Sequence, residues 1–260
     1  MINELIDGGK EFDWGKTSMD YAKYRDIYPE EFYRRITARG LCVKGQSILD
    51  LGTGTGVIPR NMQKYGAKWT GIDISENQIE QAKVLSSGMN IEYFCTPVEE
   101  ADFPDNSFDV ITACQCFWYF NHTALVPKLC DILKHGGFVV PMEMEWLPFE
   151  DDIAKQSEEL VLKYNPKWSG AGFKPHEFYI PECYFSRFEL VYHEEYTLPV
   201  RFTRESWNGR MKACRGVGAS LSEREISEWE KEHLRLLEKI APHEFDVKHF
   251  AAFAVLRKLA

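Results

Sequence analysis

The sequence predicts an α/β fold with helices on both faces of a doubly wound sheet of seven strands. Strand and helix signals alternate through the first half of the chain, and a glycine-rich turn at residues 52–56 directly follows the first apolar run. Two more strand signals lie near the C-terminus, at 188–200 and 248–258. We therefore expect five parallel strands, an antiparallel C-terminal pair, and helical insertions that act as lids.

Each strand of the parallel set is predicted from a short apolar run. The run at 108–115 is apolar on both faces, as is usual for a strand inside a parallel sheet. The five expected strands are 47–51, 69–75, 91–96, 108–115 and 138–145.

The helices are predicted from their start and stop signals. Ser75 is a candidate N-cap, and Ser222 with Glu225 forms a capping-box pattern. The glycine pair at 136–137 is expected to end a helix. The expected helices are 58–65, 75–85, 123–137, 153–164 and 223–240.

The composition indicates a globular protein with a full core. The chain has 260 residues, of which 44% are hydrophobic and 27% charged, enough for one large domain or one domain with an inserted cap. The formal net charge of -9 gives no general attraction to nucleic-acid phosphates or to an anionic membrane. We therefore expect neither a nucleic-acid partner nor a membrane partner.

The chain lacks the sequence signals of export and of membrane insertion. It has no run of about eighteen apolar residues, and residues 1–10 lack the basic-then-apolar order of an export signal. The cysteines have no framework spacing, and no second Cys or Cys/His pair completes a metal site with Cys114 and Cys116. We expect a cytoplasmic protein with reduced thiols and no metal.

The turn at 52–56 carries glycine at alternate positions, which lets a ligand approach main-chain N–H groups closely. In doubly wound sheets, ligands bind beyond the carboxyl ends of the strands. Asp73 ends the second strand, the place where a carboxylate accepts hydrogen bonds from a ribose diol. The pattern therefore indicates a ligand that contains adenosine.

Two details of the turn distinguish between adenosine ligands. Dinucleotide sites have a late third glycine where this chain has Val57. Asp50, just before the turn, would repel a pyrophosphate but suits a ligand that bears an ammonium and a sulfonium. Both details favour S-adenosylmethionine over NAD.

Four segments, in this order, resemble the class I S-adenosylmethionine-dependent methyltransferases, in the small-molecule group often called methyltransferase type 11. The segments read "ILDLGTGTG", "GIDIS", "VEEADFPDNSFDVITACQCFWYF" and "LKHGGFVV", and the resemblance covers residues 46–138. It implies a Rossmann-like core that binds S-adenosylmethionine and releases S-adenosylhomocysteine.

The resemblance also implies which residues bind the cofactor. Asp73 would bind the ribose hydroxyls, and Ile74 and Gln78 would flank the adenine and the ribose. Relatives carry an acidic residue where this chain has Pro97, so Glu99 is the candidate acceptor for the adenine amino group. The implied cofactor-binding residues are Tyr21, Arg25, Asp50, Gly52, Thr53, Gly54, Asp73, Ile74, Gln78, Pro97, Val98, Glu99 and Gln115.

A tyrosine-rich segment precedes the first strand. Ser18 is a candidate N-cap, and Tyr21, Tyr24 and Arg25 follow it at helical spacing. The segment either packs on the sheet or, as in relatives, folds over the cofactor with Tyr21 and Arg25 against the methionine carboxylate. Trp14 is expected at the same entrance.

Methyl transfer from a sulfonium needs chiefly a nucleophile held in line in a dry site. A general base helps when the acceptor is a hydroxyl or an amine. The candidate bases are His122, after the fourth strand, and Glu143 or Glu145, at the end of the fifth. Relatives have a histidine where this chain has Trp118, so a mechanism that uses that histidine is not expected. The residues expected to contact the acceptor are Trp14, Trp118, Tyr119 and Trp146.

We expect insertions to interrupt the core, because substrate choice in α/β folds usually resides in such segments. The helix at 223–240 is alternatively a dimer surface, so the chain is expected to be a monomer or a homodimer. The expected parts are an N-terminal helical cap over the cofactor site (1–45), the cofactor-binding core (46–145), a first lid (146–186), the C-terminal core strands (187–200 and 249–260) and a second, helical lid (201–248).

A methyltransferase that acts on a small, partly apolar acceptor is the leading hypothesis. The segment after the fourth strand lacks the [N/D]-P-P-[Y/F] motif with which relatives methylate base amino groups. Two alternatives stay open: a non-catalytic protein that binds an adenosyl cofactor or another partner, and a nicotinamide-dependent oxidoreductase.

Overall fold

The computed structural model describes residues 7–259, except for the side chain of Trp14. The first six residues of the segment compared with an export signal lie outside the described residues. The chain divides into two compact units. We call 28–144, 177–196 and 251–259 the sheet unit, and 7–27, 145–176 and 197–250 the helical unit.

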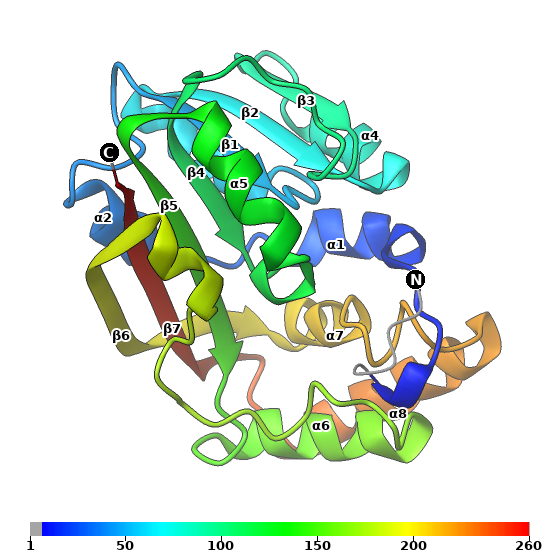
Figure 1. Cartoon of the computed structure of the whole chain (residues 1–260). Helices are drawn as coiled ribbons and strands as arrows, with labels where there is room; N and C mark the ends of the chain where they lie inside the picture. The colour runs from blue at the N-terminus through cyan, green and yellow to red at the C-terminus, as the bar shows by residue number, and fades with distance from the viewer. Residues whose placement is uncertain (1–6, 260) are drawn as a thin grey trace. The chain divides into compact units, whose positions relative to one another are not determined.

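Seven strands form one sheet in the order β3-β2-β1-β4-β5-β7-β6 (Figure 1). Strands β1 to β5 pair in parallel, and the two C-terminal strands are antiparallel, which confirms the predicted doubly wound sheet. The strands are β1 Ser47–Leu51, β2 Lys68–Asp73, β3 Ile91–Cys95, β4 Phe108–Cys114, β5 Leu133–Trp146, β6 Phe188–Thr203 and β7 Glu244–Lys258.

The strand order reverses at β1. The chain runs outward from β1 through β2 to β3 and then returns to the other side of β1 as β4. The residues at the carboxyl ends of β1 and β4 therefore lie at the topological switch point, where open α/β sheets bind their ligands.

The crossover helices of the sheet unit follow the apolar periodicity. On α4, Ile79 and Ala82 are buried and pack with Tyr93 of β3. The helices of this unit are α2 Glu30–Thr37, α3 Val57–Met62, α4 Glu76–Leu85 and α5 His122–Ile132, with short 3₁₀ turns at Gln63–Tyr65, Phe117–Tyr119 and Glu182–Ser186.

Two expected helix boundaries are wrong. Helix α5 ends at Ile132, because β5 already begins at Leu133, where it pairs with Phe108 of β4. The next partners are Val110 and Phe138, so the glycine pair at 136–137 lies in a bulge of β5 and does not stop a helix. Ser18 is the first residue of its helix and not the N-cap, which is Thr17.

The helical unit is built around α7. This helix packs against α1 and α8, and α8 also packs against α6. The capping box predicted at Ser222 and Glu225 is confirmed, and a second one, at Thr203 and Ser206, begins α7. The helices are α1 Ser18–Tyr24, α6 Asp152–Tyr164, α7 Arg204–Lys212 and α8 Glu223–Ile240, with 3₁₀ turns at Asp7–Gly9 and Trp14–Thr17.

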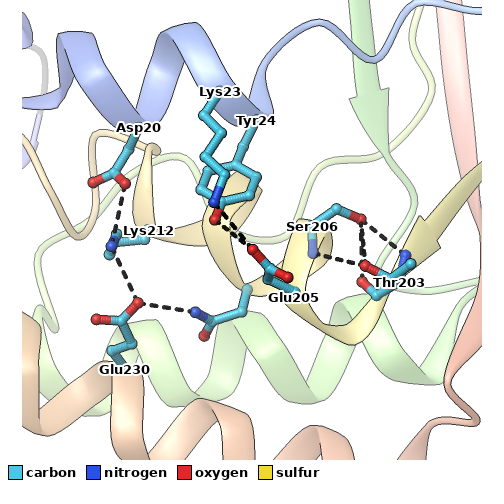
Figure 2. Close-up of polar contacts among 9 residues, drawn as sticks. Asp20, Lys23, Tyr24, Thr203, Glu205, Ser206, Lys212 and Glu230 are labelled. Carbon is cyan, nitrogen blue, oxygen red and sulfur yellow. Dashed lines mark hydrogen bonds and ion pairs between the residues drawn. The ribbon is translucent and has the colours of Figure 1, made fainter.

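Polar contacts hold α7 between its two neighbours (Figure 2). Lys212 forms ion pairs with Asp20 of α1 at 3.2 Å and with Glu230 of α8 at 3.1 Å. At the other end of α7, Glu205 accepts hydrogen bonds from Lys23 and from the Tyr24 hydroxyl, both at 3.1 Å. These contacts set the position of α7 relative to α1 and α8.

The buried polar groups at the centre of this unit form a connected network. Ser157 accepts a hydrogen bond from Trp207 Nε1 at 2.9 Å and contacts His233 Nε2 at 2.9 Å. His233 Nδ1 in turn lies 2.8 Å from Asn208 Oδ1. Burial lowers the pKa of His233 to about 3, so the imidazole is neutral and stabilises the core through one donated and one accepted hydrogen bond.

We expect Gly209→Ala to separate α1 from α7. A Cβ at Gly209 would lie 2.3 Å from a ring carbon of Tyr24, well inside van der Waals contact. The free energy of unfolding, measured with urea, should fall by about 1–3 kcal/mol. In a Tyr24→Ala background the same substitution should cost much less. An equal cost in both backgrounds would contradict this packing.

Candidate functional site

The glycine turn is attached to the end of β2 by two hydrogen bonds. Thr53 donates its N–H to the Ile72 carbonyl at 2.9 Å, and Gly54 donates its N–H to Asp73 Oδ2 at 2.9 Å. Asp73 Oδ1 accepts the N–H of Ser75 at 2.9 Å, just before α4. One carboxylate therefore joins the turn after β1 to the turn after β2.

Part of the glycine pattern serves packing, which the sequence did not reveal. A Cβ on Gly52 would lie 2.8 Å from Cys116 Sγ, whose thiol donates a hydrogen bond to the Leu51 carbonyl at 3.0 Å. A Cβ on Gly56 would lie 2.2 Å from the Tyr93 hydroxyl. Cys116 and Tyr93 thus pack directly against the turn. Both are distant from it in the sequence, so their role is visible only in the folded structure.

Asp50 lies beneath the turn and is 2% exposed. Its Oδ1 accepts a hydrogen bond from Thr112 of β4 at 2.6 Å. Burial raises the pKa of Asp50 to about 7 despite that hydrogen bond, and the nearby charge of Asp73 raises it further. A cation beside Asp50, such as a sulfonium, would stabilise the ionised carboxylate.

The residues expected around adenine lie close in the chain to Asp73 or are joined to it. Thr96 donates its N–H to the Asp73 carbonyl at 2.9 Å, which places the turn at 97–99 beside the end of β2. Ile74 is 57% exposed, whereas Gln78 on α4 and Val98 are buried. The Glu99 carbonyl accepts a hydrogen bond from Lys128 at 2.7 Å, and its side chain is exposed.

Gln115 has an unusual backbone conformation at the end of β4. Its φ is +65°, in the left-handed region that residues other than glycine rarely adopt. Its N–H donates to the Met142 carbonyl at 2.9 Å, and its side chain donates to the Met144 carbonyl. Backbone strain of this kind is common at functional sites. This is compatible with the prediction that Gln115 contacts the cofactor.

The aromatic residues after β4 form a cluster within the sheet unit. Trp118 is 40% exposed and lies 5.4 Å from Phe178 and 6.4 Å from Tyr179, measured between ring centroids. Tyr119 ends the same 3₁₀ turn and is half-buried. These rings form an apolar cluster. The contact of Trp118 and Tyr119 with an acceptor stays a prediction.

The two candidate bases of the sheet unit lie on different elements. His122 begins α5, where its Nδ1 lies 3.1 Å from the Tyr184 hydroxyl and its ring packs on Phe117 at 4.5 Å. Burial lowers the pKa of His122, so its imidazole is neutral near pH 7. Glu143 lies on β5 and is 4% exposed.

The remaining predicted residues belong to the helical unit. Arg25 donates a hydrogen bond to the Tyr21 hydroxyl at 3.2 Å, with its guanidinium over the Tyr21 ring. Trp146 is buried and donates its Nε1–H to Glu158 at 2.6 Å. Glu145 is half-buried, and burial raises its pKa. Trp14 begins a 3₁₀ turn, and its side chain lies outside the described part of the chain.

A hollow of about 690 Å³ lies along β2 and β3, lined by residues such as Trp69, Phe94 and Phe103. None of the predicted site residues lines it.

Among residues 7–259, no group of three or more His, Cys, Asp and Glu side chains could hold a metal ion. No helix in the same described range is long and apolar enough to cross a membrane.

Residues 48–137 match the family model described as "Methyltransferase domain". This segment is therefore similar to a methyltransferase domain. The match runs from β1 into β5 and includes the glycine turn, Asp50 and Asp73, which confirms the predicted resemblance. It also supports S-adenosylmethionine as the cofactor, and it favours neither the nicotinamide nor the non-catalytic alternative.

Two curated relatives are similar to about half of this chain. Both are named ubiquinone biosynthesis O-methyltransferase. The protein from Bradyrhizobium diazoefficiens is 30% identical over 55% of this chain and 57% of its own length. The protein from Bordetella pertussis is 32% identical over 48% of this chain and 54% of its own length. The chain thus spans little more than half the length of these relatives.

A solved structure shows the same fold. Phosphoethanolamine N-methyltransferase 2 from Haemonchus contortus, solved in complex with phosphomonomethylethanolamine and S-adenosylhomocysteine, is 18% identical, with a TM-score of 0.54. The similarity covers 99% of this chain and 58% of that one. At this identity, the likeness supports the Rossmann-like fold of the domain.

We expect the stability of the protein to report the ionisation of Asp50. Between about pH 4 and pH 7 the folded state keeps a proton that the unfolded state has released, so the free energy of unfolding falls as pH rises through this window. Asp50→Asn should remove this pH-dependent fall in the free energy of unfolding, because asparagine does not ionise. Urea unfolding at pH 8 should show a gain of up to about 4 kcal/mol over the natural protein, shrinking toward pH 4.

The matched control for this prediction is Asp105→Asn, which changes an exposed carboxyl in the same unit. It should alter the free energy of unfolding little at any pH. A stability difference for Asp50→Asn that stays constant from pH 4 to pH 8 would show that the carboxyl does not titrate in this window.

Proposed function

We propose that the protein is an S-adenosylmethionine-dependent methyltransferase that methylates a small-molecule acceptor. The observation that carries this proposal is the Asp73 carboxylate, held at the carboxyl end of β2 by the N–H groups of Gly54 and Ser75. Each carboxylate oxygen accepts more than one hydrogen bond, so both N–H contacts are compatible with a ribose diol on the remaining lone pairs.

The turn and its surroundings divide the remaining binding tasks. The main chain of residues 52–54 is proposed to contact the methionine part of the cofactor. Asp50, beneath the turn, is proposed to balance the positive charge of the cofactor. Ile74 and Val98 are proposed to enclose the adenine, with Glu99 near its amino group. Pro97 and Gln115 complete the set within the sheet unit. The contacts of Tyr21 and Arg25 with the methionine carboxylate stay a prediction.

When bound, S-adenosylmethionine supplies a methyl group on a positively charged sulfur, which leaves with the bonding electron pair as a neutral thioether. The protein must then hold the acceptor in line and exclude water. A hydroxyl or amine acceptor loses a proton as its new bond to carbon forms. The neutral imidazole of His122 and the carboxylate of Glu143 are the groups of the sheet unit proposed to receive it.

The acceptor is proposed to be a small, partly apolar molecule. The two curated relatives are named as O-methyltransferases of ubiquinone biosynthesis, which favours an oxygen acceptor. The net charge of -9 disfavours nucleic acid and an anionic membrane surface as partners. All seven cysteines are free thiols, as expected of a protein of the cytoplasm, where we propose that it acts as a monomer or homodimer.

Calorimetric titration tests the proposed cofactor site. The natural protein should bind S-adenosylmethionine and S-adenosylhomocysteine more tightly than NAD. Asp73→Asn should weaken the binding of S-adenosylhomocysteine by about 10- to 100-fold, because a hydrogen bond to a charged group contributes about 1.5–3 kcal/mol.

The matched control is Asp109→Asn. Asp109 also accepts a backbone N–H, that of Ser47 at 2.7 Å, but at the opposite end of β1. This variant should bind S-adenosylhomocysteine like the natural protein. Tighter binding of NAD, or equal losses in both variants, would overturn the proposal.

A further inference from the structure

Arg210 of α7 is buried, and two of its nitrogens have no hydrogen-bond partner among the described residues. Its side chain is 1% exposed, and among residues 7–259 its Nε and Nη1 find no acceptor. Taking a charge out of water without pairing it is strongly unfavourable. A guanidinium in this state would be stabilised by an added anionic acceptor.

Other buried ionisable groups in the helical unit do have partners. Arg215 forms an ion pair with Asp7 at 3.1 Å, and Asp7 also accepts the N–H of Ser169 at 2.7 Å. His233 contacts Asn208 and Ser157. Arg210 differs from Arg215 in that no ion pair compensates its charge among the described residues.

Trp146 fixes the position of the guanidinium. The Arg210 guanidinium carbon lies 4.6 Å from the centroid of the Trp146 ring, a cation–π contact. Trp146 is held by Glu158, which accepts its Nε1–H at 2.6 Å and accepts the N–H of Gly172 at 2.8 Å on its other oxygen. The face of the guanidinium is therefore covered, and its in-plane N–H groups remain for a ligand.

The charges around Arg210 favour an anion. The positive charge of Arg25 lowers the pKa of Arg210, after burial itself, to about 10. The charge of Glu145 opposes this effect and raises the pKa of Arg210. Burial also raises the pKa of Glu145. An added anion would stabilise the charged guanidinium of Arg210.

The helical unit also contains a buried acceptor that is influenced by the same charges. His249 is 0% exposed and donates its Nδ1–H to the Val247 carbonyl at 2.9 Å, so Nε2 carries a lone pair, and no described residue donates to it. The charges of Arg210 and Arg25 act on His249. An aromatic wall links the two residues, because Trp207 packs against Trp146 at 5.7 Å and against His249 at 6.4 Å.

We propose that Arg210 and His249 bind a small carboxylic acid that also carries a hydroxyl group. The carboxylate accepts hydrogen bonds from the guanidinium, and the hydroxyl donates to His249 Nε2. The rings of Trp207 and Phe202, which lies 5.9 Å from His249, suit an aromatic or unsaturated carbon skeleton. That this acid is the methyl acceptor rests on the proposed function; that the helical unit binds it does not.

Calorimetry on the full chain tests this site with four probes: benzoate, its neutral amide benzamide, 3-hydroxybenzoate and inorganic phosphate. Benzoate should bind at least about tenfold more tightly than benzamide, because only the carboxylate pairs with the guanidinium. The hydroxylated acid should bind more tightly than benzoate. Equal binding of benzoate and benzamide, binding of neither, or tighter binding of phosphate would overturn the proposal.

Three variants assign the contacts. Arg210→Met should reduce benzoate binding by at least about tenfold and leave the protein as stable as before or more stable, because an unpaired buried charge is removed. His249→Phe should remove only the preference for the hydroxylated acid. Arg224→Met, which changes an exposed arginine of α8, should bind all probes like the natural protein. Unchanged benzoate binding in Arg210→Met would contradict the assignment.

S-adenosylhomocysteine binding, measured in the same variants, separates the two proposals. It should be unchanged in Arg210→Met. If benzoate binds and S-adenosylhomocysteine does not, the anion site stands and the methyltransferase proposal fails. If S-adenosylhomocysteine binds and benzoate does not, the anion site fails and the proposed function stands.

Discussion

The hydrogen bond from the Gly54 N–H to the Asp73 carboxylate is the contact on which the rest of the candidate site depends. It connects the turn after β1 to the end of β2, and the same carboxylate holds the N–H of Ser75 before α4. The parallel register of β1 and β2 brings these groups together, since Leu51 pairs with Ile72. A carboxylate placed this way organises the turn first and is then available to a ribose diol.

The same region carries an electrostatic cost that a cationic ligand would offset. Asp50 is buried beneath the turn, and its raised pKa shows that the unliganded fold disfavours the charged form. The helical unit shows the opposite case, with Arg210 buried and its donors unpaired. In both cases burial destabilises the charged form of the side chain in the unliganded protein. This is typical of sites that bind a ligand of opposite charge.

Local patterns were enough to predict the sheet, the seven strands and the capping box at Ser222, because each depends on residues near in sequence. The end of α5 could not be predicted, because the glycine pair at 136–137 reads equally well as a helix stop and as a bulge. The roles of Cys116 and of Arg210 depend on neighbours distant in sequence, such as Gly52 and Trp146. Nothing in the local sequence distinguishes the buried Arg210 from a surface arginine.

A crystal structure with S-adenosylhomocysteine tests the central claim most directly. We predict both ribose hydroxyls within about 3 Å of the Asp73 carboxylate oxygens, with the Gly54 N–H still on Oδ2 and the adenine beside Ile74 and Val98. A nucleoside seated elsewhere, such as in the hollow along β2 and β3, or bound at the turn without contact to Asp73, would contradict it.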